Sequence, residues 1–481
     1  MNFRMIARLT GRLLMVEAII MLIPMVVSIY FGENIFPVYI VTAGILLTAG
    51  LGMNFLKPES KRIYARDGFV LVSLTWILMS LFGALPFTMS GAIPSFIDAF
   101  FETVSGFTTT GATILTDIET LPKSLLFWRS FTHWIGGMGV IVFVLAVLPQ
   151  KEMQSMHIMR AEVPGPTVGK LVSKTKATAR ILYKIYAVMT IAEVFALKLC
   201  GLPFFDSITT AFSTAGTGGF SVRNASIAAY DNIAAEIVIA IFMLFFGINF
   251  NLFYLSILKQ FRRVFKSEEL WAYLGIVATA VILITLDIYP LLGSVASALR
   301  ESGFTVASII TTTGFITADY TKWPPFSQFI ILLLMFTGAC SGSTGGGLKV
   351  GRLIILFKAG LRQLKRAVNP QRVKCLRLDG AVLEEEVVSS TNSYFLIYML
   401  LIGVSTFIIS INEFDILTSL TAVITCINNV GPGFGAIGPV DNFSVFSAFS
   451  KIILSLDMLA GRLEIFPMVI LVMPYTWKKN T

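Results

Sequence analysis

Apolar runs of about twenty residues recur along the whole chain, and each is long enough for a helix to cross a bilayer. Their spacing predicts ten full-length spans. The spans lie near residues 12–32, 37–56, 67–88, 124–149, 180–201, 232–258, 269–290, 326–358, 393–411 and 445–475. The pattern therefore predicts an all-α integral membrane protein with ten transmembrane helices.

Four shorter apolar stretches alternate with these spans, and they are too short to cross a bilayer. They lie at residues 95–107, 203–213, 295–310 and 415–427. Each stretch ends in a turn of small residues that contains glycine. A short helix followed by such a turn is typical of a re-entrant segment, in which non-helical backbone lines a wet cavity or is buried in protein.

The order of span, short helix, glycine loop and span occurs four times after an initial pair of spans. The four loops align on Gly111, Gly216, Gly314 and Gly431, which recur about every hundred residues. This repetition predicts fourfold pseudo-symmetry around one axis. The expected units are an N-terminal two-helix hairpin at 1–66 and four pore repeats at 67–150, 151–266, 267–390 and 391–481.

An aspartate lies near the start of three of the short helices, at Asp98, Asp206 and Asp415. A carboxylate there can cap free amides and complements the positive end of the helix dipole. The C-terminal ends of the four helices would then carry partial negative charge toward the middle of the membrane. Four such ends favour a cation over an anion.

Composition agrees with a membrane protein, since 55% of the residues are hydrophobic and only 14% are charged. The formal net charge of +9 could suggest a nucleic-acid partner, but the basic residues sit in short loops between apolar runs. That placement indicates topology and no nucleic-acid binding. The basic segments lie at 57–66, 151–180, 259–266, 362–377 and 478–479. The positive-inside rule places these segments and both termini in the cytoplasm, which an even number of spans also requires.

Few residues in the chain suit catalysis or a structural metal. The four cysteines are scattered without a C-x-x-C pair, and the two histidines, His133 and His157, are far apart. A metal or catalytic cluster needs more ligands than any one segment offers. The sequence therefore predicts a protein that is not an enzyme and carries no covalently bound cofactor.

The glycine loops suit an ion filter, because a potassium ion that sheds its water needs rings of backbone carbonyls. Glycine allows the dihedral angles that point those carbonyls at an axis, and threonine hydroxyls can add oxygens. One loop alone could be an ordinary turn between helices, but four copies at matching places favour a filter. The candidate potassium-binding residues are Thr109, Thr110, Gly111, Thr214, Ala215, Gly216, Thr312, Thr313, Gly314, Asn429, Val430 and Gly431.

Residues 338–349 contain the glycine triplet Gly345, Gly346 and Gly347 inside an apolar span. The segment superficially resembles a phosphate-binding loop, but Leu348 separates the last glycine from Lys349, so the spacing is wrong. The triplet should break the helix and leave a flexible plug near the pore. Close helix packing through small residues is the alternative.

Arg462 lies within the last span, where charged residues are rare and usually functional. It is expected to face a cavity or a partner. Asp457 and Glu464 are nearby in the sequence, so a structural ion pair is the alternative.

Several motifs together resemble the Trk/Ktr/HKT superfamily of potassium transporters, and most closely its bacterial TrkH potassium uptake branch, which has the extra N-terminal pair of spans. The resemblance covers nearly the whole chain. The matching motifs are Ser-Gly-Phe-Thr-Thr-Thr-Gly-Ala-Thr (105–113), His-Trp-Ile-Gly-Gly-Met-Gly (133–139), Phe-Ser-Thr-Ala-Gly-Thr-Gly-Gly-Phe-Ser (212–221), Ser-Gly-Ser-Thr-Gly-Gly-Gly (341–347) and Gly-Arg-Leu-Glu-Ile-Phe (461–466).

The resemblance implies a homodimer in the bacterial inner membrane, surrounded by lipid, with a cytoplasmic ring of TrkA-like nucleotide-binding regulatory subunits. It also implies that the broken helix near Gly345, Gly346 and Gly347 is a gate, that Arg462 lines the pore, and that four filter glycines select potassium over sodium. The leading hypothesis is a gated, channel-like potassium uptake subunit. The main alternative is a secondary symporter of potassium with protons or sodium. An ion-binding subunit of a potassium pump, or a membrane enzyme, fits the motifs less well.

Overall fold

The computed structural model describes residues 1–57, 64–139, 175–370 and 375–477. Within them the regular secondary structure is almost entirely helical, and the strands are confined to a short hairpin of β1 (Arg377–Leu378) and β2 (Ala381–Val382). The all-α prediction is confirmed. The basic segment at 478–479, most of that at 151–180 and parts of those at 57–66 and 362–377 lie outside the described residues, as does the end of the span expected at 124–149.

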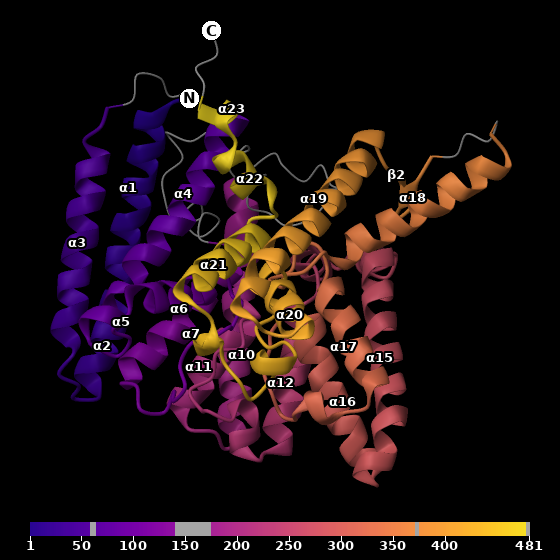
Figure 1. The fold of residues 1–481 in the computed structure, drawn as a ribbon, viewed down its shortest axis with the longest axis horizontal. Helices are drawn as coiled ribbons and strands as arrows, with labels where there is room; N and C mark the ends of the chain where they lie inside the picture. Colours follow the sequence, from indigo (N-terminus) through magenta and orange to yellow (C-terminus); the bar gives the residue numbers. More distant parts are fainter. Residues whose placement is uncertain (58–63, 140–174, 371–374, 478–481) are drawn as a thin grey trace.

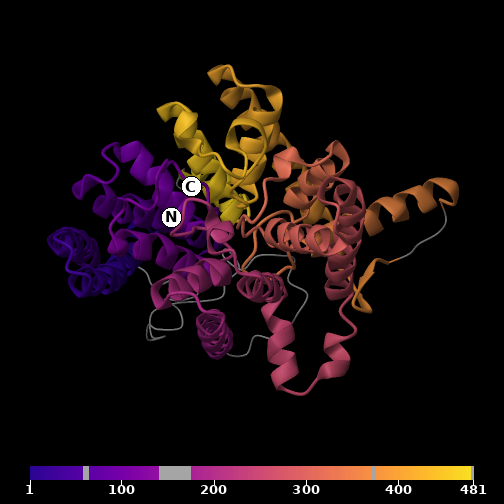
Figure 2. The ribbon, with the colours of Figure 1, turned by 90° about the horizontal axis from the view of Figure 1, so that it is seen from below.

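The N-terminal hairpin stands at the outer edge of the molecule (Figures 1 and 2). It consists of α1 (Phe3–Ile20), α2 (Leu22–Tyr30) and α3 (Phe36–Asn54). The first helix begins about nine residues earlier than expected, so the N-terminal arginines lie within it, and Arg12 Nε donates to Asn54 Oδ1 at 3.2 Å. Gly11 and Gly50 bring α1 and α3 together, because a Cβ on either would lie 2.6 Å from the carbonyl oxygen of the other.

Four short helices follow the predicted short apolar stretches closely. They are α6 (Phe96–Phe107), α11 (Phe204–Gly216), α16 (Val295–Ile310) and α20 (Ile416–Ile427). Each is preceded by one helix and followed by another. The preceding helices are α4 (Ala65–Gly83, extended by α5, Leu85–Met89), α10 (Thr175–Leu199), α15 (Glu268–Leu292) and α19 (Glu385–Ile409); the following ones are α7 (Lys123–Gly137), α12 (Ile233–Phe246), α17 (Pro325–Thr337) and α21 (Ala448–Arg462). Seen from below, these four units follow one another around a common centre (Figure 2).

The aspartates near the starts of these helices have different roles. Asp415 caps α20, since its Oδ2 accepts from Thr418 N at 3.2 Å. Ser95 caps α6 instead of Asp98, whose carboxylate pairs with Lys451 at 2.7 Å. Asp206 accepts from the Tyr230 hydroxyl at 2.9 Å. The capping prediction is therefore correct for the fourth helix and wrong for the first two, where the carboxylates bind side chains from other elements.

Three of the expected spans are broken near the centre of the molecule. The break in the span at 326–358 was predicted from its glycines, and it separates α17 from α18 (Val350–Val368). The breaks in the other two spans were not predicted. The chain bends by 90° between α12 and α13 (Phe250–Ile257), and residues 463–465 separate α21 from α22 (Phe466–Val472).

Five helices among the described residues are long and apolar enough to cross a membrane, or six if the bent pair α12 and α13 counts as one span. They lie at Phe3–Tyr30, Phe36–Asn54, Arg66–Met89, Glu268–Leu292 and Glu385–Asn412. The N-terminus and α23, the last described element, lie at the same edge of the molecule (Figure 1), where the rings of Phe3 and Trp477 stack. The remaining short elements are α14 (Phe261–Val264), α23 (Pro474–Trp477), η2 (Ser226–Tyr230), η3 (Tyr320–Lys322), η4 (Ser410–Asn412), η5 (Gly435–Ile437) and η6 (Phe443–Val445).

Candidate functional site: a ring of four glycine loops

The four glycine loops, residues 108–111, 216–219, 311–314 and 428–431, share one backbone conformation. In each loop the second and fourth residues have positive φ, in the left-handed region that side chains rarely adopt. The φ values are 57° and 79° at Thr109 and Gly111, 56° and 76° at Thr217 and Gly219, 58° and 80° at Thr312 and Gly314, and 54° and 98° at Asn429 and Gly431. The loops are therefore structural repeats.

This conformation changes the predicted alignment of the second loop. The third residue of each loop donates its N–H to a carbonyl five residues back, from Thr110 to Ser105 at 2.9 Å and from Gly218 to Ser213 at 2.8 Å. Gly219 therefore corresponds to Gly111, and the alignment on Gly216 is three residues too early. Gly216 is the last residue of α11. The predicted site residues Thr214 and Ala215 likewise lie within the helix.

The loops form a closed ring in chain order, and glycine is needed wherever two loops meet. A Cβ on Gly111 would overlap the carbonyl oxygen of Gly218, because it would lie well within 3.0 Å of it and real Cβ atoms essentially never come that close to another heavy atom. A Cβ on Gly219 would overlap Thr313 O in the same way, and one on Gly314 would overlap Val430 O. A Cβ on Gly431 would lie 2.7 Å from Thr110 O, which closes the ring.

Side chains tie the ring together and leave polar atoms within it. The hydroxyls of Thr108 and Thr110 lie 2.8 Å apart, and the same distance separates Thr311 and Thr313. Asn429 Nδ2 donates to Thr110 Oγ1 at 2.9 Å across the junction of the fourth and first loops. Thr109 Oγ1 is buried and has no hydrogen-bond partner among the described residues.

The four short helices end at the ring, and their last carbonyls carry partial negative charge. Backbone oxygens of four loops around one centre can replace the water shell of a cation. The ring can therefore hold a dehydrated monovalent cation and disfavours an anion.

The linker between α17 and α18, residues 338–349, lies against two loops of the ring. Gly346 N donates to Thr312 Oγ1 at 2.7 Å. A Cβ on Gly345 would lie 2.9 Å from Thr311 O, and one on Gly346 would overlap Asn428 O. These glycines therefore lie against the third and fourth loops, where a side chain would meet backbone, as the alternative of close packing through small residues also requires.

Two charged residues hold the ends of this linker. Glu269 Oε1, in the first turn of α15, accepts from Ser341 N at 2.6 Å and from Gly351 N at 2.8 Å. Lys349 is buried and donates through Nζ to Gly345 O. The linker is thus fixed at its start, in its middle and at its end.

Arg462 joins the linker to the C-terminal end of α7. Its guanidinium donates to Thr344 O at 2.8 Å and to the carbonyls of Gly136 and Gly137, both at 2.6 Å. The two acids near it in sequence bind elsewhere. Glu464 pairs with Arg352, and Asp457 accepts from Ser405 Oγ at 2.8 Å.

The sequence interpretation missed a buried ion pair behind the first two loops, Glu102 of α6 and Arg129 of α7, 2.8 Å apart. The available signal was a charged residue inside each of two apolar helices, in Phe-Phe-Glu-Thr-Val and Phe-Trp-Arg-Ser-Phe. Such charges are rare in membrane segments and usually functional.

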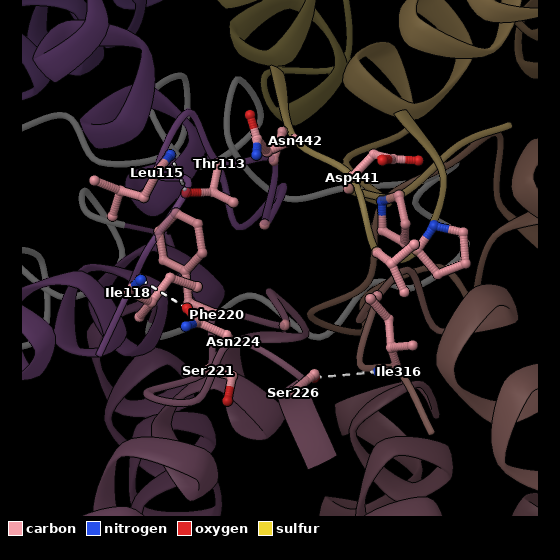
Figure 3. Close-up of a pocket in the computed structure, with 18 of the residues that line it drawn as sticks. Thr113, Leu115, Ile118, Phe220, Ser221, Asn224, Ser226, Ile316, Asp441 and Asn442 are labelled. Atoms are coloured by element: carbon pink, nitrogen blue, oxygen red, sulfur yellow. Dashed lines mark hydrogen bonds between the residues drawn. The ribbon is translucent and has the colours of Figure 1, made fainter. Parts of the chain in front are cut away.

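A cavity of about 150 Å³ opens where the chain continues beyond the ring glycines. It is lined by residues that follow all four loops, among them Thr113, Phe220, Ile316 and Asp441 (Figure 3). Cross-bonds fix its walls, including Ile118 N to Asn224 Oδ1 at 2.7 Å and Ile316 N to Ser226 Oγ at 3.2 Å. The cavity gives one side of the ring an open, partly polar mouth.

Comparison with known proteins gives a consistent result. The TrkH family model, described as cation transport protein, matches residues 32–478. The Trk system potassium uptake protein TrkH of Salmonella typhimurium is 36% identical over 100% of both chains, and the TrkG protein of Escherichia coli is 34% identical over 99% of both. The crystal structure of the potassium transporter TrkH from Vibrio parahaemolyticus matches with a TM-score of 0.88 and 34% identity, covering 99% of this chain and 100% of that one. These names describe potassium transport rather than catalysis.

Proposed function

Because the chain belongs to the TrkH family of cation transport proteins, we propose that it is the potassium-conducting subunit of a Trk-type uptake system. The ring of glycine loops is its selectivity filter, and the four short helices are re-entrant pore helices among ten transmembrane spans. Potassium is the transported ion and binds at the loop carbonyls. The corrected set of ring glycines is Gly111, Gly219, Gly314 and Gly431.

The observation that carries this proposal is the closed ring. Each glycine packs against the carbonyl of the residue before the next glycine, so the four loops fix one another's carbonyl positions. A filter discriminates between cations of different size through the number and placement of such oxygens. Thr109, Thr217, Thr312 and Asn429 hold the same position in the four loops, and each carries a side-chain oxygen.

The linker at 338–349 is the gate in this proposal. It is non-helical, contacts the third and fourth loops, and is held to α7 by Arg462. Cys340 and Leu348, near the two ends of the linker, are buried in the apolar core. Between them, small residues let the linker lie against the ring, and hydrogen bonds hold it there. A segment held in this way can leave its position without unfolding the helices around it.

We further propose that the protein spans the bacterial inner membrane with both termini and the basic segments in the cytoplasm. The N-terminus and α23 lie at one edge of the molecule in Figure 1, which supports this orientation, as does the charge distribution. The partners in this proposal are a second copy of the chain, surrounding lipid, and a cytoplasmic nucleotide-binding regulatory ring.

Rubidium uptake into liposomes that hold the purified protein tests the function. A channel-like subunit should take up rubidium along its own electrochemical gradient, with empty liposomes as the control. Uptake that requires an imposed proton or sodium gradient would instead support a secondary symporter. No uptake by well-folded protein under either condition would refute both.

A further inference from the structure

A buried ion pair joins the first and second loops, and among the described residues the other three junctions have no such pair. Glu102 and Arg129 are almost wholly inaccessible, with side-chain exposures of 0% and 1%. Removing one partner of such a pair leaves a buried charge without compensation, which is far more costly than losing an exposed ion pair. An ion pair buried this deeply therefore fixes the positions of the backbone segments that its two side chains contact.

Glu102 holds the chain that leaves the first loop. Its carboxylate accepts from the Thr113 hydroxyl at 3.0 Å and from Ile114 N at 3.0 Å, two and three residues after Gly111. It also accepts from Arg129 Nε at 2.8 Å. The same carboxylate thus binds the exit of the first loop and the guanidinium.

Arg129 holds the chain that leaves the second loop. Its guanidinium donates to Ser221 O at 3.2 Å and lies 4.0 Å from the centre of the Phe220 ring. These residues directly follow Gly219. Thr113, Phe220 and Ser221 line the same cavity (Figure 3). The planar fork of arginine suits this task, because it can serve a carboxylate and a carbonyl together.

Within the part of the chain that the structure describes, the bonds between loops at the other three junctions join uncharged groups. Ala228 N donates to Ile316 O at 3.2 Å, the Tyr320 hydroxyl to Gly433 O at 3.1 Å, and Phe443 N to Thr113 O at 2.8 Å. In the register set by the positive-φ residues, the positions equivalent to Glu102 are Thr210, Thr305 and Ala422. The carboxylate is therefore specific to the first repeat.

We propose that Glu102 and Arg129 are positioning residues for ion selection, which fix the first two loops against each other and thereby set the spacing of the carbonyls at that junction. This inference rests on the proposed function as a potassium filter. Neither side chain needs to touch the ion, since a shift of a fraction of an ångström in the carbonyls is enough to change which cation fits.

The test compares the Glu102→Gln and Arg129→Lys variants with wild type in planar bilayers, by the reversal potential under opposed potassium and sodium gradients. Gln keeps the shape of Glu102 but removes its charge, and Lys keeps the charge of Arg129 but loses the fork. We expect the potassium-to-sodium permeability ratio to fall about tenfold or more in each variant, whereas total cation current falls less. A purely structural pair would lower the amount of folded protein and leave the ratio unchanged.

The matched control is Glu236→Gln. Glu236 accepts two hydrogen bonds from Arg300, of 2.6 and 2.7 Å, which join α12 to α16. Its substitution by Gln should leave the potassium-to-sodium ratio at the wild-type value. A wild-type ratio in either folded Glu102 or Arg129 variant overturns the inference, and so does failure of both to fold, since the pair would then serve folding alone. A wild-type protein that carries no potassium would refute the proposed function instead.

Discussion

Replacing Gly111 with serine is the most direct perturbation of the ring. Gly111 has φ of 79°, and its missing side chain leaves room for the carbonyl of Gly218 in the next loop. A Cβ would overlap that oxygen and would lie 3.1 Å from the carbonyl carbon. Both of these Gly218 atoms belong to the backbone, so neither can move aside by a change of side-chain rotamer, and the two loops must separate.

The size of the effect follows from two contributions. A non-glycine residue in the left-handed region costs about 1–2 kcal/mol. The overlap adds a displacement of the Gly218 carbonyl, since real Cβ atoms essentially never come closer than 3.0 Å to another heavy atom. A change of about 1.4 kcal/mol in the difference between potassium and sodium binding alters their ratio tenfold. We therefore expect the potassium-to-sodium ratio to fall about tenfold or more, with a smaller loss of total cation flux.

The assay is the reversal potential, or rubidium uptake in competition with sodium, for wild type and variant in the same liposomes. Gly91→Ser is the matched control, because Gly91 has φ of 76° but a Cβ there would meet no described atom within 4 Å. It reproduces the backbone strain without the collision. Gly219→Ser should resemble Gly111→Ser, since its Cβ would overlap Thr313 O.

An unaltered potassium-to-sodium ratio in a well-folded Gly111→Ser protein would show that Gly111 is not part of the filter. The assignment of the other three ring glycines would then be wrong as well. A loss of selectivity equal to that in Gly91→Ser would mean that strain alone, and not the contact between loops, produced the effect.

Three further outcomes are expected. Deleting residues 343–347 should raise basal rubidium flux in liposomes without any partner protein, because the segment that lies against the ring is then gone; unchanged flux would contradict its role as a gate. Replacing the basic segments 151–180 and 362–377 with neutral linkers should abolish co-purification with a cytoplasmic regulatory ring, and co-purification that survives would disprove that contact. Tyr320→Phe should lower the free energy of unfolding by about 1 kcal/mol, because the buried Gly433 carbonyl loses its 3.1 Å bond; thermal melting in detergent measures this, and an unchanged melting temperature would show that the bond contributes nothing.

The sequence by itself determined the parts of this protein that depend on local pattern. Apolar length and composition identified α6, α11, α16 and α20 to within a few residues, since a short apolar helix needs no distant contact to be recognised. Repetition of small residues after each helix identified the loops. The glycines of residues 345–347 predicted a broken helix, because glycine is a poor helix former wherever it occurs.

Only the tertiary structure decided the register of the second loop. The run Ser-Thr-Ala-Gly (213–216) looks locally like Thr-Thr-Thr-Gly (108–111), so the sequence favoured Gly216. The requirement for glycine at Gly219 comes instead from the carbonyl of Thr313, which lies about ninety residues away in the chain.

The same reason applies to the ion pair behind the ring and to the unpredicted helix breaks. Glu102 and Arg129 belong to different helices, and what gives them a role is Ser221, a residue of the next repeat. The 90° bend between α12 and α13 is joined to the α17–α18 linker by bonds such as Cys340 N to Gly247 O at 3.0 Å. The short helices are specified mainly by neighbours in the chain, whereas the ring is specified by backbone groups that meet only when four separate repeats have packed around one centre.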